Sequence, residues 1–167
     1  MIMEQHSKSK VIDLEIYTDG SCKGGALRYG GWAFIVVEDS KMIYYGAGGE
    51  RNTTNQRMEL RAIAEALAWV KENRGHNQRV AIYSDSAYAI NCYSQHWWEN
   101  WKKNGWRNSK GDDVANADLW GLIIPYFTNL WYEFHKVNGH SGVFWNEECD
   151  KYAQREADLL KKEWRGT

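Results

Sequence analysis

The sequence predicts an α/β protein with a mixed five-stranded sheet and flanking helices, and two observations lead to this prediction. Residues 11–48 carry three segments with the composition and periodicity of β-strands, whereas residues 56–164 alternate helical with strand-like segments. The expected order of elements is therefore βββαβαβα. In this order an antiparallel meander is followed by strands that return through helical crossovers, which places antiparallel and parallel pairs in one sheet.

The three N-terminal strands are expected to form the meander. Apolar residues occupy alternate positions over residues 11–17, which predicts a half-buried strand. After a glycine-rich turn, GWAFIVVED (31–39) predicts the second strand, and KMIYYGAG (41–48) predicts its hairpin partner across Asp39 and Ser40.

A long amphipathic helix is predicted over residues 56–73. Strong helix formers fill this segment, and Leu60, Ile63 and Leu67 repeat at the spacing of one helical face. Gly75 follows directly and is expected to end the helix, because glycine readily adopts the left-handed conformation of a helix C-terminus.

The second half of the chain alternates strand and helix signals. A break in the long helical region is expected near Gly105 and Gly111. The predicted elements are a strand over 80–84, mostly helical structure over 86–128, a strand over 130–137 and a helix over 146–164.

Length and composition predict one soluble domain. The chain has 167 residues, enough to bury a core without disulfides, and we expect a single domain over residues 11–167 after a loose tail over residues 1–10. The N-terminus has no signal-peptide pattern, and apolar runs such as AFIVV (33–37) are too short to cross a bilayer. These features predict a cytoplasmic protein that does not bind membranes.

Charge and cysteine content narrow the function classes further. The formal net charge is −1, so any binding of a polyanion would use a local basic patch. Cys22, Cys92 and Cys149 are odd in number and form no CxxC pair, which argues against a disulfide framework and a zinc site and favours a reducing compartment.

Two short segments run from a β-forming stretch into an aspartate. EIYTDGS (15–21) contains Asp19, and AIYSDS (81–86) contains Asp85. Aspartate, glycine and serine are also ordinary turn residues, so either copy alone is explained by the end of a strand. If the two strands are parallel neighbours, however, both aspartates lie side by side in the crevice at the carboxyl ends of the strands.

Two further acids extend the apolar faces of the predicted helices. Glu59 precedes Ile63 by four residues, and Asp150 precedes Ala153 by three residues and Ala157 by a further four. Each acid alone is explained by the helix macrodipole, which favours acids at a helix start. Together with the two aspartates they form a set of hard oxygen ligands without cysteine or paired histidine, which is what Mg²⁺ or Mn²⁺ prefers.

Five motifs occur in a fixed order over residues 17–150: YTDGS, TTNQRMEL, YSDS, NGHSG and NEECD. With these motifs the sequence resembles type-one ribonuclease H from about residue 11 to 160. The resemblance implies a ribonuclease H-like fold in which Asp19, Glu59, Asp85 and Asp150 are catalytic acids that hold two Mg²⁺ ions, with Mn²⁺ as a substitute. It implies that Asp19 bridges both ions. It also implies that His140 assists proton transfer or product departure.

The same resemblance implies the reaction and the substrate. The RNA strand of an RNA–DNA hybrid would be cut endonucleolytically to give 5′-phosphate and 3′-hydroxyl ends. Separately from the resemblance, we expect a monomer without an obligate protein partner. The residues implied along the minor groove are Gly20, Ser21, Cys22, Asn55 and Gln56, together with Glu59. Thr54 and Asn116 match positions that hold a DNA phosphate in this family.

A basic, tryptophan-rich segment, QHWWENWKKNGWRNSK (95–110), is the candidate surface for the DNA strand. Lysines attract phosphates and flat aromatic rings pack on sugars, and Trp101, Lys102 and Lys103 match the family's basic protrusion best. The alternative is an amphipathic helix with tryptophans in the core and lysines toward solvent.

Two departures from the family pattern concern substrate affinity. The turn CKGGALRYGG (22–31) lacks the usual Asn-Pro, and Asn52 stands where an arginine often supports the phosphate pocket, although Arg51 is adjacent.

Other classes remain open: a non-catalytic hybrid-binding module, a DNA nuclease or transposase of the same superfold, and an aspartyl-phosphate phosphatase. The last class expects a second acid two residues after the first, where this chain has Ser21.

Overall fold

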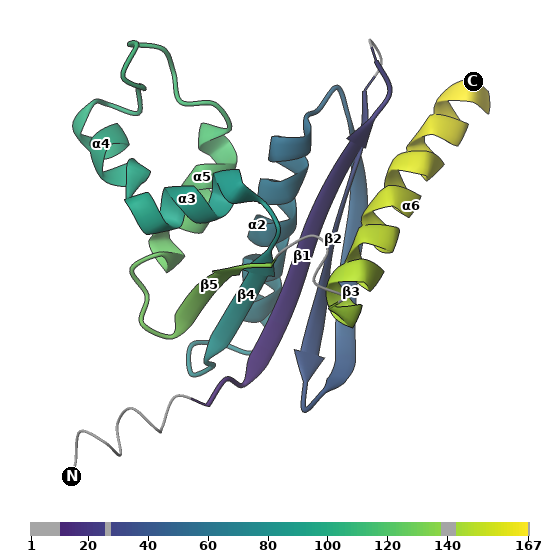
Figure 1. The fold of residues 1–167 in the computed structure, drawn as a ribbon, viewed down its shortest axis with the longest axis horizontal. Helices are drawn as coiled ribbons and strands as arrows, with labels where there is room; N and C mark the ends of the chain where they lie inside the picture. Colours follow the sequence, from purple (N-terminus) through teal and green to yellow (C-terminus); the bar gives the residue numbers. More distant parts are fainter. Residues whose placement is uncertain (1–10, 26–27, 138–142, 167) are drawn as a thin grey trace.

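Five strands form one sheet in the order β3-β2-β1-β4-β5 in the computed structural model, which describes residues 11–25, 28–137 and 143–166 (Figure 1). The β1–β2 and β2–β3 pairs are antiparallel, whereas β1–β4 and β4–β5 are parallel. The strands are β1 (Leu14–Lys23), β2 (Tyr29–Glu38), β3 (Lys41–Arg51), β4 (Val80–Ser84) and β5 (Tyr132–Lys136). The predicted mixed α/β fold is confirmed.

Helices cover both faces of this sheet. One face packs against α2 with α3 and α5 beside it, and α6 lies across the other face over β1, β2 and β3 (Figure 1). The helices are α2 (Asn55–Asn73), α3 (Ala87–Gln95), α4 (Trp97–Lys103), α5 (Ala117–Ile123) and α6 (Phe144–Gly166), with a 3₁₀ turn η1 (Ile124–Tyr126) after α5. Each face therefore has its own apolar core, a large one under α2 and a smaller one under α6.

The prediction of a half-buried strand over 11–17 is wrong in extent and in burial. The strand begins at Leu14 and continues through Lys23, because the residues expected to form a turn pair with β2 as far as Lys23 and Tyr29. It is also buried on both faces: Ile16 faces the α2 core, and Tyr17 faces the α6 core. A central strand between two helical layers has no solvent face.

Local turn and cap signals agree with the structure. Asp39 and Ser40 both have positive φ, 51° and 66°, as a two-residue type I′ hairpin requires. The side chain of Thr54 caps α2 by accepting a hydrogen bond from the backbone N–H of Arg57. Gly75, with φ of 76°, donates its N–H to the carbonyl of Val70 and ends the helix as predicted.

The region over 86–128 is less helical than predicted. Positive φ values at His96, Trp106 and Asn116 separate short helices.

Among the residues that the structure describes, no helix has both the length and the apolar character needed to cross a membrane. The expected tail over residues 1–10 lies outside the described residues.

Candidate active site

Asp19 and Asp85 occupy equivalent places on two parallel neighbours. The ladder between β1 and β4 ends with the pair of Thr18 and Ser84, and each aspartate is the next residue of its chain segment. Asp19 is thus inside β1, still paired with β2, while Asp85 follows the end of β4. The expected neighbourhood of the two aspartates is correct, although the parallel ladder, and not the strand, ends before Asp19.

Glu59 reaches the same place from the first turns of α2 because Gly20 allows the helix close to β1. A Cβ atom on Gly20 would lie 2.2 Å from the carbonyl carbon of Met58 and 2.3 Å from the nitrogen of Glu59. Any side chain at this position would therefore push the helix away from the strand. The glycine of the TDGS motif is a packing requirement for the site.

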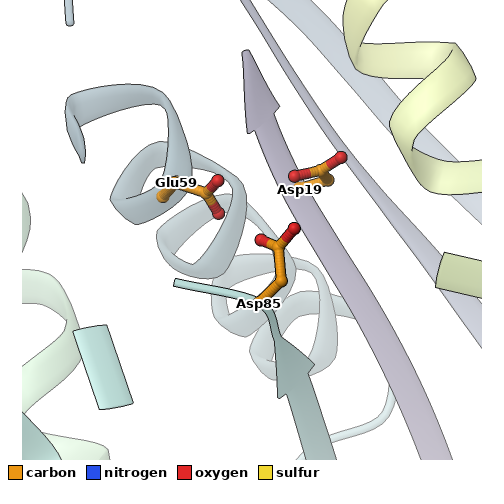
Figure 2. A group of neighbouring side chains, drawn as sticks. All are labelled: Asp19, Glu59 and Asp85. Carbon is orange, nitrogen blue, oxygen red and sulfur yellow. The ribbon is translucent and has the colours of Figure 1, made fainter. Parts of the chain in front are cut away.

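The carboxylates of Asp19, Glu59 and Asp85 form a compact group. One oxygen of each lies within 4.8 Å of those of the other two, and Figure 2 shows them gathered from β1, α2 and the end of β4. Asp19 is 4% exposed, so its carboxylate has lost nearly all its hydration. Such a group of like charges is unfavourable unless protons or cations neutralise it.

The electrostatics of the three acids follow from this crowding. Burial, then repulsion from Asp85 and interactions with Asp150, raises the pKa of Asp19 to about 8. Burial and the charges of Asp19 and Asp85 raise the pKa of Glu59 well above its usual value, and burial raises the pKa of Asp85. At neutral pH the metal-free group therefore holds protons that isolated carboxyls would have released.

The donor set suits a hard divalent cation. Glu59 Oε2 and Asp85 Oδ1 are buried and have no hydrogen-bond partner among the described residues. Buried acceptors without donors are costly, and a cation with oxygen ligands would satisfy them. The three residues offer carboxylate oxygens and no sulfur or imidazole, which fits Mg²⁺ or Mn²⁺.

Asp150 joins the group from the opposite side of the sheet. It lies on α6 outside the set of three, yet both hydrogen bonding and charge from Asp150 act on Asp19. Its Oδ2 accepts a 2.7 Å hydrogen bond from Gln154. The helix comes close because Gly31 has no side chain: a Cβ there would lie 1.9 Å from the carbonyl oxygen of Ala153.

His140, the remaining residue implied in catalysis, lies outside the described residues. The structure therefore gathers Asp19, Glu59 and Asp85, with Asp150 interacting with Asp19, and does not describe the histidine loop.

The residues expected along the minor groove surround the N-terminus of α2. Asn55 Oδ1 accepts a 2.7 Å hydrogen bond from the backbone N–H of Cys22, which ties the end of β1 to the helix. Ser21 is half-buried, and Gln56 is exposed beside Asn55. Residues 20–22 follow Asp19 directly in the chain, and Asn55 and Gln56 lie within about one turn of Glu59. The expected minor-groove residues are therefore next to the acid cluster.

Arg57 is a residue whose role the sequence did not reveal. Its guanidinium contacts Glu50 at 3.1 Å, Asp118 at 2.8 and 3.0 Å, and Asn116 at 3.5 Å. It thus links α2 to β3 and to the start of α5. Its partners lie 7, 59 and 61 residues away in the chain, so no local pattern points to them.

The tryptophan-rich segment has the arrangement of the amphipathic alternative, with tryptophans packed inward and lysines toward solvent. Trp98 is buried, and the ring of Trp101 packs between Trp106 at 6.0 Å and Trp120 at 5.6 Å. Lys102 and Lys103 are exposed at the end of α4. The tryptophans therefore pack the helical region, and the lysines face solvent.

Asn52 adopts a left-handed conformation with φ of 53°, which asparagine tolerates better than arginine does. Its position at the turn after β3 gives a backbone reason for this departure from the family pattern.

Comparisons with known proteins agree with this geometry. The family model described as RNase H matches residues 12–158. A curated protein named Ribonuclease H from Syntrophomonas wolfei subsp. wolfei is 48% identical over 144 residues, which cover 85% of this chain and 94% of that protein. Another of the same name, from Caldicellulosiruptor saccharolyticus, is 39% identical over 143 residues, 85% and 94% of the two chains.

Solved structures show the same fold. LC9-RNase H1, described as a type 1 RNase H with the type 2 active-site motif, superposes with a TM-score of 0.73 at 27% identity, covering 87% of this chain and 72% of that chain. The solution structure of the PFV RNase H domain gives a TM-score of 0.71 at 19% identity over 88% and 95% of the two chains.

Proposed function

The chain belongs to the ribonuclease H family, whose members degrade RNA in RNA–DNA hybrids, and we propose that it cuts the RNA strand endonucleolytically to give 5′-phosphate and 3′-hydroxyl ends. The observation that carries the proposal is the buried group of Asp19, Glu59 and Asp85, whose oxygens lie within 4.8 Å of one another. A carboxylate group of this kind suits phosphodiester hydrolysis assisted by divalent cations.

Two Mg²⁺ ions, or Mn²⁺ in their place, are proposed to be held by Asp19, Glu59, Asp85 and Asp150. When bound, such ions supply an activated water and neutralise charge at the departing oxygen. Asp19 would contribute to holding both ions, because it interacts with Asp85 as well as with Asp150 and is buried. We also propose that His140 assists proton transfer or product departure, on the strength of its motif.

Choice of the RNA strand is proposed to come from the residues at the end of β1 and the start of α2. The 2′-hydroxyl distinguishes RNA from DNA, and it both donates and accepts hydrogen bonds. The side chains of Asn55 and Gln56 and the backbone over Gly20–Cys22 offer matching groups next to the acid cluster.

The DNA strand is proposed to contact Thr54 and Asn116 through one phosphate, and the exposed Lys102 and Lys103 through others. Trp101 contributes mainly by holding α4 in place, because its ring packs against neighbouring tryptophans. This division gives the DNA strand a surface separate from the acid cluster.

The deciding experiment is incubation of the protein with RNA–DNA, RNA–RNA and DNA–DNA duplexes, each with and without Mg²⁺. We expect cleavage of the RNA strand of the hybrid alone, dependent on the cation, with product ends identified by their susceptibility to phosphatase and ligase. Asp85→Asn should lower the rate of cleavage by a factor on the order of 10³ while leaving the affinity for hybrids unchanged. Binding of hybrids without cleavage by the wild type would support a non-catalytic module instead.

A further inference from the structure

We propose that Arg57 is a positioning residue that turns the amide of Asn116 toward the DNA strand and neutralises Asp118 beside it. This inference rests on the proposed function, because it assigns a cause to phosphate binding at Asn116. Arg57 itself would not touch the substrate. Its donors are directed toward protein groups, as the contacts around it show.

The guanidinium of Arg57 makes four hydrogen bonds to protein groups. Nε donates to Glu50 Oε1 at 3.1 Å, Nη1 and Nη2 donate to the two oxygens of Asp118 at 3.0 and 2.8 Å, and Nη1 also donates to Asn116 Oδ1 at 3.5 Å. The fork geometry of the pair with Asp118 is the strongest form of such an interaction. The side chain is 24% exposed, so few directions remain for a phosphate.

The contact with Arg57 sets the polarity of the Asn116 amide. With its carbonyl oxygen toward the guanidinium of Arg57, the amide directs its NH₂ group away from that guanidinium, where it is available as a donor. A phosphate only accepts hydrogen bonds, so this is the orientation that binds it. Asn55 shows the same polarity, since its carbonyl oxygen accepts the N–H of Cys22 at 2.7 Å.

The backbone of Asn116 is held by its own hydrogen bonds, so Arg57 can affect only the rotation of the Asn116 side-chain amide. Asn116 has φ of 60°, and its carbonyl accepts the N–H groups of Leu119 and Trp120 at 3.0 Å each. The main chain is therefore fixed at the start of α5, whereas the amide could rotate if Arg57 were absent.

Arg57 also controls the charge next to the phosphate position. Asp118 is two residues from Asn116 and its side chain is 62% exposed, so its carboxylate would repel a DNA backbone. The two hydrogen bonds from Arg57, at 3.0 and 2.8 Å, pair the two groups and hold the pKa of Asp118 below its usual value. Loss of Arg57 would uncover the charge of Asp118 and that of Glu50.

Arg61 provides a matched control one turn later on α2. It has the same charge and approaches the same Glu50 at 3.9 Å, but its close partner is Glu65 at 2.9 Å. Arg61→Ala thus removes one arginine from the same helix without touching Asn116 or Asp118.

The test measures binding of hybrids by proteins that also carry Asp85→Asn, so that the substrate stays intact. A set of hybrids carries one uncharged methylphosphonate at each DNA linkage in turn. We expect one linkage at which the substitution weakens binding by the otherwise wild-type protein, and no such linkage after Arg57→Ala or Asn116→Ala. Arg57→Ala should weaken binding of the unmodified hybrid about ten-fold, and Arg61→Ala less than about two-fold.

Two further variants separate positioning from a general loss of structure. Arg57→Ala combined with Asp118→Asn should recover part of the affinity for the hybrid, but not the sensitivity to methylphosphonate at one linkage. Arg57→Lys should recover neither the affinity nor this sensitivity in full. Unfolding temperatures verify that each variant folds. If the wild type binds and cuts hybrids but the weakened linkage persists after Arg57→Ala, this inference alone is overturned. Failure of the wild type to bind or cut hybrids would overturn the proposed function with it.

Discussion

Gly20 lies so close to Glu59 that a Cβ atom at position 20 would be 2.3 Å from the backbone nitrogen of the glutamate. The contact joins the middle of β1 to the start of α2, and through it the sheet sets the position of one acid relative to the others. Substitution of this glycine therefore tests whether the spacing of the acid cluster matters for cleavage.

Gly20→Ala should lower the free energy of unfolding by about 1–3 kcal/mol and reduce cleavage far more than the loss of folded protein explains. The added methyl group forces α2 outward and takes Glu59 with it. Chemical denaturation and initial cleavage rates under folded conditions measure the two effects. Gly121→Ala is the control: a Cβ there meets nothing within 4 Å, so cleavage should stay unchanged, and alanine inside α5 should raise the free energy of unfolding by up to about 1 kcal/mol.

Without cations, the stability of the protein should fall as the pH rises from about 4 to about 8. Burial and neighbouring acids raise the pKa of Asp19 to about 8, so the folded state keeps a proton that the unfolded state releases near pH 4. The stabilisation that comes from this proton on Asp19 is complete below the unfolded-state pKa near 4. It is lost as the pH rises through the folded-state pKa of about 8. Thermal unfolding in EDTA at a series of pH values measures this slope.

Asp19→Asn should flatten that slope and raise the free energy of unfolding at pH 8 in EDTA by about 2 kcal/mol, because it removes a buried like charge. The same substitution should abolish cleavage. Glu147→Gln, at an exposed position in α6, is the matched control and should change neither. If Asp19→Asn destabilises the cation-free protein at pH 8, the carboxylates are not crowded as the structure describes.

Addition of Mg²⁺ should reverse the loss of stability, and more strongly at pH 8 than at pH 6. A cation must replace the protons held by Asp19 and Glu59, so its apparent affinity rises with pH. The measurement is the increase in unfolding temperature at equal ionic strength with Mg²⁺ or with NaCl. Glu59→Gln should remove most of the increase, and an equal increase in that variant would place the cation elsewhere.

The order of elements and the convergence of the acids could be predicted because both follow from local patterns. A strand, an aspartate and a helical crossover are sufficient to place Asp19 next to Asp85 once the strands are parallel. The true length of β1 could not be predicted, because it depends on pairing with β2 through Lys23, where the residues themselves favour a turn.

The contacts that position the site were equally inaccessible from the sequence. The close approach allowed by Gly20 and Gly31 depends on how α2 and α6 pack on the sheet. The ion pair of Arg57 with Asp118 spans 61 residues, and the burial of Trp101 depends on Trp120 in another helix. Residue types identify the chemistry, whereas tertiary packing decides which side chains support it.

Neutralising Lys102 and Lys103 together should weaken hybrid binding and reduce its dependence on salt. Each lysine that contacts a phosphate releases about one counterion, so the slope of log affinity against log salt should fall by about 1–2 in Lys102→Gln/Lys103→Gln. Both lysines are exposed at the end of α4, so the unfolding temperature should change little.

Lys161→Gln/Lys162→Gln is the control for that experiment, because it removes the same charge from α6 on the opposite face of the sheet (Figure 1). Binding titrations from 50 to about 300 mM salt should show a full slope for this variant. Equal losses of slope from the two lysine pairs would mean that net charge alone controls affinity. A loss confined to the α4 pair would mean that the DNA strand crosses the surface formed by Lys102 and Lys103, which is where the proposed function places it.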